Sequence, residues 1–186
     1  MHSEEYDGPT LSDLMTMLGH KDGLIRKKGR EGLQALGKPA VPPLCQALLT
    51  AKDHHVRWAA AKALGELRDP DSAPALVDAL EDRNSDVVWL AAVALENLGR
   101  DAWKPLLQAL VDRGVDSVAI RQGTHHVFSK QKNPQFDDLL DELRAALKFG
   151  ELTESGGIAA TELLKRLREQ EAADGADWAN PPNDAG

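Results

Sequence analysis

The sequence predicts an all-α protein, a right-handed α-solenoid of about four helix pairs with half a pair at each end. The first observation is a repeat: the segment VRWAAAKALGEL, which begins at Val56, returns 31 residues later as VVWLAAVALENL. Periods in the thirties are typical of helical solenoids, whose units bury their apolar faces only against neighbouring units. The second observation is composition. Aromatic residues make up only 4% of the chain, and the abundant alanine and leucine favour closely packed helices over a sheet.

Each predicted unit begins with an alanine-rich helix, and we expect these first helices at 25–36, 56–67 and 87–98. Asp22 and Asp53 stand at N-cap positions, and each precedes an arginine (Arg26 or Arg57) by four residues. This spacing predicts helix capping by the aspartate and an ion pair within the helix. In the helix at 56–67, one apolar stripe follows the 3.6-residue period and consists of Val56, Ala60, Ala63, Leu64 and Leu67.

A second helix completes each unit and opens at a proline. Pro43, Pro74 and Pro105 each stand just before a pair of leucines that are four residues apart. Proline is tolerated at a helix start because its missing N–H would have no partner there. We expect Gly37 and Gly99 to end the first helices of their units.

The two ends of the chain are less regular. Residues 11–18 predict a lone helix of the second type, residues 116–147 a fourth unit, and residues 158–170 a further helix of the first type. Residues 1–9 and 171–186 have the composition of flexible acidic tails, which we expect to be disordered. Trp178 lies in the second tail, either as a docking motif or without a role. The predicted solenoid therefore spans residues 10–170.

The net charge of −8 lies mostly in these tails, which hold seven acidic residues and neither lysine nor arginine. The body is left with 23 acidic and 22 basic residues, so it has no strong field for nucleic acid. The longest apolar run, residues 87–95, has nine residues, far fewer than the ~20 that cross a bilayer. Because the first residues lack the pattern of a signal peptide and Cys45 is the lone cysteine, we expect a cytoplasmic protein.

The segment 53–80, DHHVRWAAAKALGELRDPDSAPALVDAL, resembles the HEAT-like repeat of the phycobilisome-lyase (PBS lyase) type. The resemblance covers residues 10–170 and implies an armadillo-like α-solenoid whose second helices line the concave side. Most members of this family bind other proteins, and a few are bilin lyases, hydroxylases or DNA-repair enzymes. Val88 departs from the pattern, which has an arginine at that position.

The concave side is the first candidate binding surface. In each second helix, the residue two positions after the first core leucine points away from the core. The resulting column is polar to acidic with apolar edges, which suits a protein or peptide partner. The expected contact residues are Gln46, Leu49, Asp78, Glu81, Gln108, Val111 and Glu142.

A weaker candidate lies on the convex side. Trp58 and Trp89 are one period apart and point roughly opposite the apolar stripes of their helices. They either pack in the grooves between successive first helices or act as exposed aromatic anchors for a partner.

We expect no catalytic, cofactor-binding or metal-binding residues. The chain has no His-Glu pair, no Gly-rich phosphate loop and no CxxC motif. His125 and His126 are adjacent in one predicted helix and point about 100° apart, so a packing role is expected for them. A basic cluster that is suited to phosphate covers only the first unit, and it consists of Lys21, Arg26, Lys27, Lys28, Arg30 and Lys38.

The predicted function is a non-enzymatic scaffold or adaptor that binds a protein or peptide through the concave face. A bilin-lyase-like or other small-molecule-handling protein is the first alternative, and nucleic-acid contact through the basic cluster is the second. The identity of the partner and the oligomeric state stay open.

Overall fold

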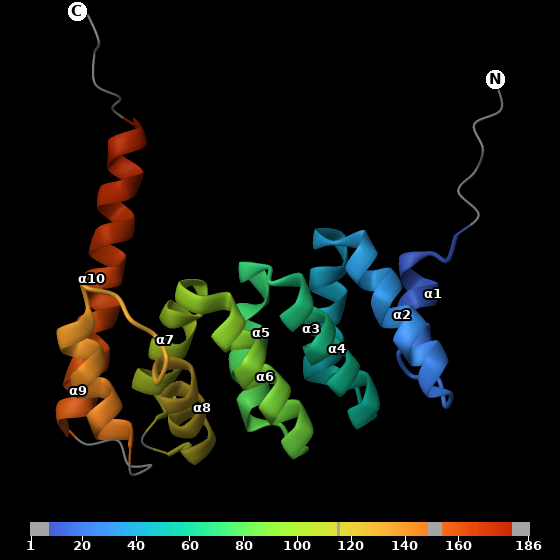
Figure 1. Cartoon of the computed structure of the whole chain (residues 1–186), viewed down its shortest axis with the longest axis horizontal. Coiled ribbons are helices and arrows are strands. Elements are labelled where there is room, and N and C mark those ends of the chain that lie inside the picture. Colours follow the sequence, from blue (N-terminus) through green and yellow to red (C-terminus); the bar gives the residue numbers. More distant parts are fainter. Residues whose placement is uncertain (1–7, 115, 149–153, 180–186) are drawn as a thin grey trace, which may run out of the picture. The chain divides into compact units, whose positions relative to one another are not determined.

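The computed structural model describes residues 8–114, 116–148 and 154–179. Every regular element within these ranges is helical, and the helices follow one another as antiparallel pairs (Figure 1). The predicted all-α solenoid is therefore confirmed. The chain packs as two compact units, Met1–Ala102 and Trp103–Gly186.

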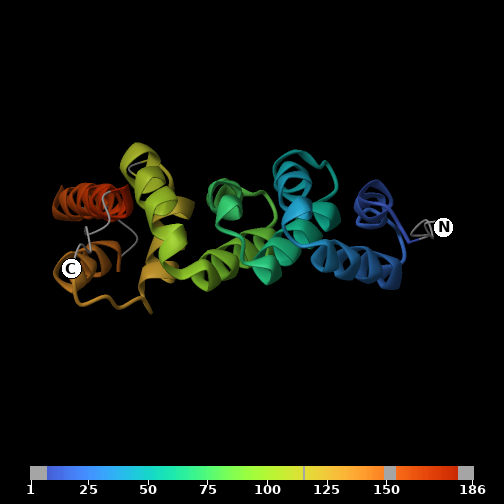
Figure 2. The ribbon, with the colours of Figure 1, turned by 90° about the horizontal axis from the view of Figure 1, so that it is seen from above.

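Unit 1 contains six α-helices in two rows. Helices α2 (Gly23–Leu36), α4 (His54–Leu67) and α6 (Ser85–Leu98) form the row of first helices. Helices α1 (Leu11–Met17), α3 (Val41–Thr50) and α5 (Ala73–Asp78) form the other row, and a 3₁₀ turn over Ala79–Glu81 extends α5 (Figure 2). Each first helix begins two residues before the start expected from the repeat.

The helix ends of unit 1 follow from local sequence. The side chain of Asp22 accepts a hydrogen bond from the Leu24 N–H (2.8 Å), and Asp53 accepts one from the His55 N–H (2.9 Å). Both predicted N-caps are therefore confirmed. Gly37 (φ 69°) and Gly99 (φ 59°) end α2 and α6 in backbone conformations that favour glycine.

Small residues allow the first helices to approach closely. Ala63 and Ala94 are completely buried or nearly so, and a Cβ atom added at Gly65 would lie 3.0 Å from the Cβ of Ala94. At such a distance a larger side chain does not fit without a shift of the backbone. The alanine-rich pattern thus sets the spacing between α4 and α6.

Unit 2 is built around aromatic side chains. It contains α7 (Trp103–Arg113), α8 (Val118–Phe128), α9 (Asp137–Leu147) and α10 (Glu154–Ala179). Trp103 is 1% exposed at the start of α7, and its ring centroid lies 5.4 Å from that of Phe128 and 6.2 Å from that of Phe136. Trp103 is therefore part of the core at the start of α7.

The structure corrects two expectations about α10. We expected a further helix of the first type over residues 158–170, and in unit 1 successive first helices such as α4 and α6 contact one another. Instead, the main contacts of α10 are with α9 and α7. We also expected the helix to end at Gln170 and a disordered tail to follow, but α10 continues to Ala179. The side chain of Trp178 and residues 180–186 lie outside the described part of the chain.

No helix among the described residues combines the length and the hydropathy that a membrane span requires.

Candidate functional site

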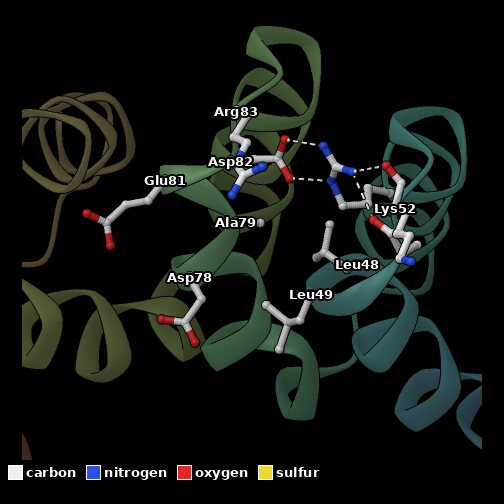
Figure 3. Close-up of a pocket in the computed structure, with 10 residues that line it drawn as sticks. Leu48, Leu49, Lys52, Asp78, Ala79, Glu81, Asp82 and Arg83 are labelled. Atoms are coloured by element: carbon white, nitrogen blue, oxygen red, sulfur yellow. Dashed lines mark hydrogen bonds and ion pairs between the residues drawn. The ribbon is translucent and has the colours of Figure 1, made fainter.

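A groove of about 400 Å³ lies in unit 1, where α3 and α5 end beside the start of α4 (Figure 3). Three of the seven residues that the sequence placed on the concave face line it, namely Leu49, Asp78 and Glu81. The remaining lining residues are Leu48, Ala51, Lys52, Arg57, Ala79, Asp82 and Arg83.

The floor of the groove is apolar. Leu48 and Ala79 are buried, whereas Leu49 is 49% exposed. Consecutive residues of a helix point about 100° apart. Because Leu48 packs into the core, Leu49 is turned toward the groove, and it offers an apolar side chain to solvent there.

An ion pair between Arg57 and Asp82 closes one end of the groove. Arg57 Nε donates to Asp82 Oδ2 (2.6 Å), and Nη2 donates to Oδ1 (2.9 Å). The two side chains are only 13% and 9% exposed. Arg57 Nη1 also donates to the carbonyl oxygens of Ala51 (2.9 Å) and Lys52 (3.1 Å). One guanidinium therefore joins two successive interhelix loops, and it fixes the rim of the groove.

The pKa values of this pair shift in opposite directions. Burial by itself would raise the pKa of the Asp82 carboxyl. Hydrogen bonds from Arg57 and the Asn84 N–H, together with the charge of Arg57, outweigh burial and lower that pKa. The hydrogen bond to Asp82 raises the pKa of Arg57. Both groups are held in their charged forms.

Arginines at the starts of first helices repeat part of this arrangement. Arg26 Nη1 donates to the carbonyl oxygens of His20 (2.8 Å) and Lys21 (3.0 Å), as Arg57 does one unit later. The expected i,i+4 bond from Arg57 to Asp53 is replaced by its bonds to Asp82 and the loop carbonyls. Helix α6 has Val88 at the equivalent position, so the series of arginines is interrupted there.

Charged side chains of both signs surround the apolar floor. Asp78 and Glu81 approach from α5 and its terminal turn, and Lys52 and Arg83 come from the two interhelix loops. Figure 3 shows Asp78 and Glu81 on one side of Ala79 and Lys52 on the other. The groove thus carries charges of both signs. These charges would fix the orientation of a bound chain more than they would attract it from a distance.

A second hollow lies on the opposite side of α3, between α3 and α1. It has a volume of about 620 Å³. Gln46, another of the predicted concave residues, lines it together with Thr10, Leu11, Ser12, Met15, Pro43, Ala47 and Thr50. Both hollows border α3, so the predicted concave residues of unit 1 lie along one row of helices.

The predicted concave residues of unit 2 have different surroundings. Gln108 Oε1 accepts a hydrogen bond from Arg168 of α10 (2.7 Å), and Gln108 Nε2 donates to Asp112 (2.9 Å). Val111 and Glu142 are exposed on α7 and α9. The sequence did not anticipate that α10 would contact Gln108, because its apolar stripe matched that of a first helix.

The two convex tryptophans differ in exposure. Trp58 is partly covered, with the guanidinium carbon of Arg30 6.0 Å and the Lys62 ammonium 5.5 Å from its ring centroid. Trp89 is 62% exposed. The side chain of Trp58 is therefore partly packed, and that of Trp89 is largely exposed.

Three of the six residues of the basic cluster have acidic partners within unit 1. Lys27 pairs with Glu31 (3.6 Å), Arg30 lies 3.7 Å from Glu66, and Lys38 lies 3.0 Å from Asp71. The remaining field around α2 is weaker than its sequence suggests.

Some groups that the sequence analysis did not combine lie together. Asp53, His54 and His55 place possible metal-ligating atoms within 4.8 Å of one another at the exposed start of α4. The bond between Arg57 and Asp82 was also missed, because the two residues are 25 positions apart and only the packing of successive helix pairs joins them. No short-range pattern signals such a contact.

Comparison with known proteins agrees with these helix pairs. Residues 41–125 match the family model of HEAT repeats. The chain is also similar to the uncharacterized phycocyanin operon protein Z of Pseudanabaena tenuis (strain PCC 7409), with 31% identity over 116 residues. The match covers 58% of this chain and 57% of that relative, so the chain spans little more than half of the relative's length. The helix pairs within residues 41–125 are therefore similar to HEAT repeats.

Proposed function

We propose that the chain is a non-enzymatic interaction module, which binds a segment of a partner protein along α3 and α5 of unit 1. The observation that carries this proposal is Leu49, a half-exposed leucine in a groove that has charged walls. Apolar side chains surrounded by polar groups are typical of protein-binding surfaces.

The chemistry of the groove specifies the partner segment. An apolar side chain of the partner would cover Leu49, and removing that surface from water supplies most of the affinity. On the side of Ala79 opposite Asp78 and Glu81, Lys52 favours an acidic side chain next to it. The apolar contact and this charge together set the direction of the bound chain.

Preorganisation supports the same function. The bond network of Arg57 fixes the loops that carry Lys52 and Asp82 before any partner arrives. A site whose loops are already ordered loses less conformational entropy on binding. The hollow between α1 and α3 extends the surface to Gln46, so that a longer segment would cross three helices.

The alternatives receive less support. A bilin-lyase-like activity would require an acid and an aromatic side chain converging on a deep groove, and none of the 10 lining residues is aromatic. The phycocyanin operon appears in the name of the relative and does not assign a bilin to this chain. We therefore expect added bilin to leave the visible absorbance of the bilin unchanged. Nucleic-acid contact is disfavoured by the acidic partners of Lys27, Arg30 and Lys38.

We infer a cytoplasmic setting for this interaction. It is supported by the single cysteine, because cysteine-poor chains do not depend on an oxidising compartment. Cys45 is half-buried, and burial raises the pKa of its thiol, which keeps the thiol protonated and unreactive.

The experiment is a quantitative pull-down with the full chain as bait, followed by affinity measurement with the captured partner. Leu49→Arg is expected to weaken binding at least about tenfold, because it places a charge at the centre of the apolar floor. Leu24→Arg is the matched control, since Leu24 is 71% exposed on α2 and away from the groove. Equal affinity for both variants would show that the partner does not bind in the groove.

A further inference from the structure

Trp58 and Trp89 occupy the same position in successive repeats, and cationic side chains from two helices lie over the ring of Trp58. Arg30 of α2 and Lys62 of α4 approach the Trp58 ring at 6.0 and 5.5 Å. Glu66 holds both cations, at 3.7 Å from Arg30 and 3.9 Å from Lys62. A cation within about 6 Å of an indole centroid is attracted by the negative face of the ring.

The repeat shows which residues replace this cover one unit later. The positions 31 residues after Arg30, Lys62 and Glu66 are Ala61, Val93 and Asn97. None of the three carries a charge, and alanine and valine are too short to extend over an indole ring. This substitution explains why Trp89 is 62% exposed whereas Trp58 is partly covered.

The charge next to the ring differs as well. On α6, Asp86 lies one turn before Trp89, so it is on the same helix face as the indole. The equivalent position on α4 is His55. The face of α6 therefore combines an exposed indole with a carboxylate, where α4 has an indole with its own cations.

We propose that Trp89 is a docking site for an arginine or lysine side chain in a basic segment of a partner protein. The partner's cation would take the place that Arg30 and Lys62 take over Trp58, and Asp86 would complement its charge. This surface belongs to α6 in the row of first helices. It is distinct from the groove between α3 and α5, so it adds a second contact to the proposed function and does not depend on it.

The test uses the full chain labelled with ¹⁵N and a hexa-arginine peptide as the probe. We expect the indole N–H signal of Trp89 to shift in a saturable way, and hexa-glutamate to leave it unchanged. Trp89→Ala is expected to weaken the affinity for hexa-arginine at least about fivefold. An unchanged affinity would mean that the peptide binds acidic surface in general, and it would overturn the proposal.

A second variant keeps the indole and occupies its face. Val93→Lys places a lysine one turn after Trp89, as Lys62 stands one turn after Trp58, and it should weaken hexa-arginine binding at least about threefold. Ala35→Lys adds the same charge at an exposed position of α2 and serves as the matched control. Equal losses for the two lysine variants would assign the effect to overall charge and contradict a site at Trp89.

Discussion

Arg57 and Asp82 form a two-point ion pair that joins the start of α4 to the loop before α6, with nitrogen–oxygen distances of 2.6 and 2.9 Å. The same guanidinium binds two carbonyl oxygens of the preceding loop. In a solenoid, each unit depends on its neighbours for stability. This pair is one of the polar contacts that hold two successive helix pairs of unit 1 in register.

Removal of Arg57 should therefore destabilise unit 1. Arg57→Ala leaves a largely buried Asp82 carboxylate without its main counter-ion, and such a loss typically costs about 3 kcal/mol of unfolding free energy. Arg26→Ala removes a similar pair of carbonyl bonds, and about 1 kcal/mol is expected. Urea unfolding followed by circular dichroism measures both. If the two variants lose equal stability, the bond to Asp82 contributes nothing.

The pair also predicts how stability depends on pH. The folded state lowers the pKa of Asp82 below its ordinary value of 3.8. When the pH falls through this range, the unfolded state takes up a proton first, so stability is present above about pH 4 and is lost as the pH drops toward the folded pKa. Asp82→Asn should flatten the decline in melting temperature between pH 5 and pH 3. A decline as steep as that of the unchanged chain would contradict this role of Asp82.

Close packing between α4 and α6 makes Ala94 sensitive to size. Ala94→Leu adds volume where the helices approach most closely, and overpacking of this kind costs about 1–3 kcal/mol. Ala35→Leu, at an exposed site on α2, is the control and should change stability little. Thermal unfolding of the two variants decides the point, and identical melting temperatures would show that our register for α4 and α6 is incorrect.

A buried and an exposed tryptophan allow a direct comparison of their contributions to stability. Trp103 is 1% exposed and packs against Phe128 and Phe136, whereas Trp89 is 62% exposed. Trp103→Ala should destabilise unit 2 by about 3–5 kcal/mol because it leaves a large cavity. Trp89→Ala should change the unfolding free energy by less than about 0.5 kcal/mol. A large loss of stability for Trp89→Ala would show that its ring is part of the core.

The features that could be predicted from the sequence are those set by short-range periodicity. The 31-residue repeat located α2, α4 and α6, and the aspartates at positions 22 and 53 located two of their N-termini. The prolines located the second helices. These signals work because helix propensity, capping and apolar spacing act over a few residues.

The features that the sequence did not reveal depend on contacts between distant residues. Helix α10 carries the apolar spacing of a first helix, yet it packs on α7 and α9, because the same stripe fits either surface. The bond from Arg168 to Gln108 follows from that packing. Three of the residues that line the groove were among those predicted from the sequence, namely Leu49, Asp78 and Glu81. Arg57 and Asp82 form its rim only because successive helix pairs stack on one another.

The most direct test of the proposed groove is hydrogen–deuterium exchange of the full chain, alone and with its captured partner. A partner bound in the groove is expected to slow exchange at residues 47–52 and 78–83, which carry the floor and both charged sides. Leu49→Arg is expected to abolish this protection, and Leu24→Arg is expected to retain it. Unchanged exchange at 47–52 and 78–83 in a saturated complex would contradict the proposal that the partner binds there.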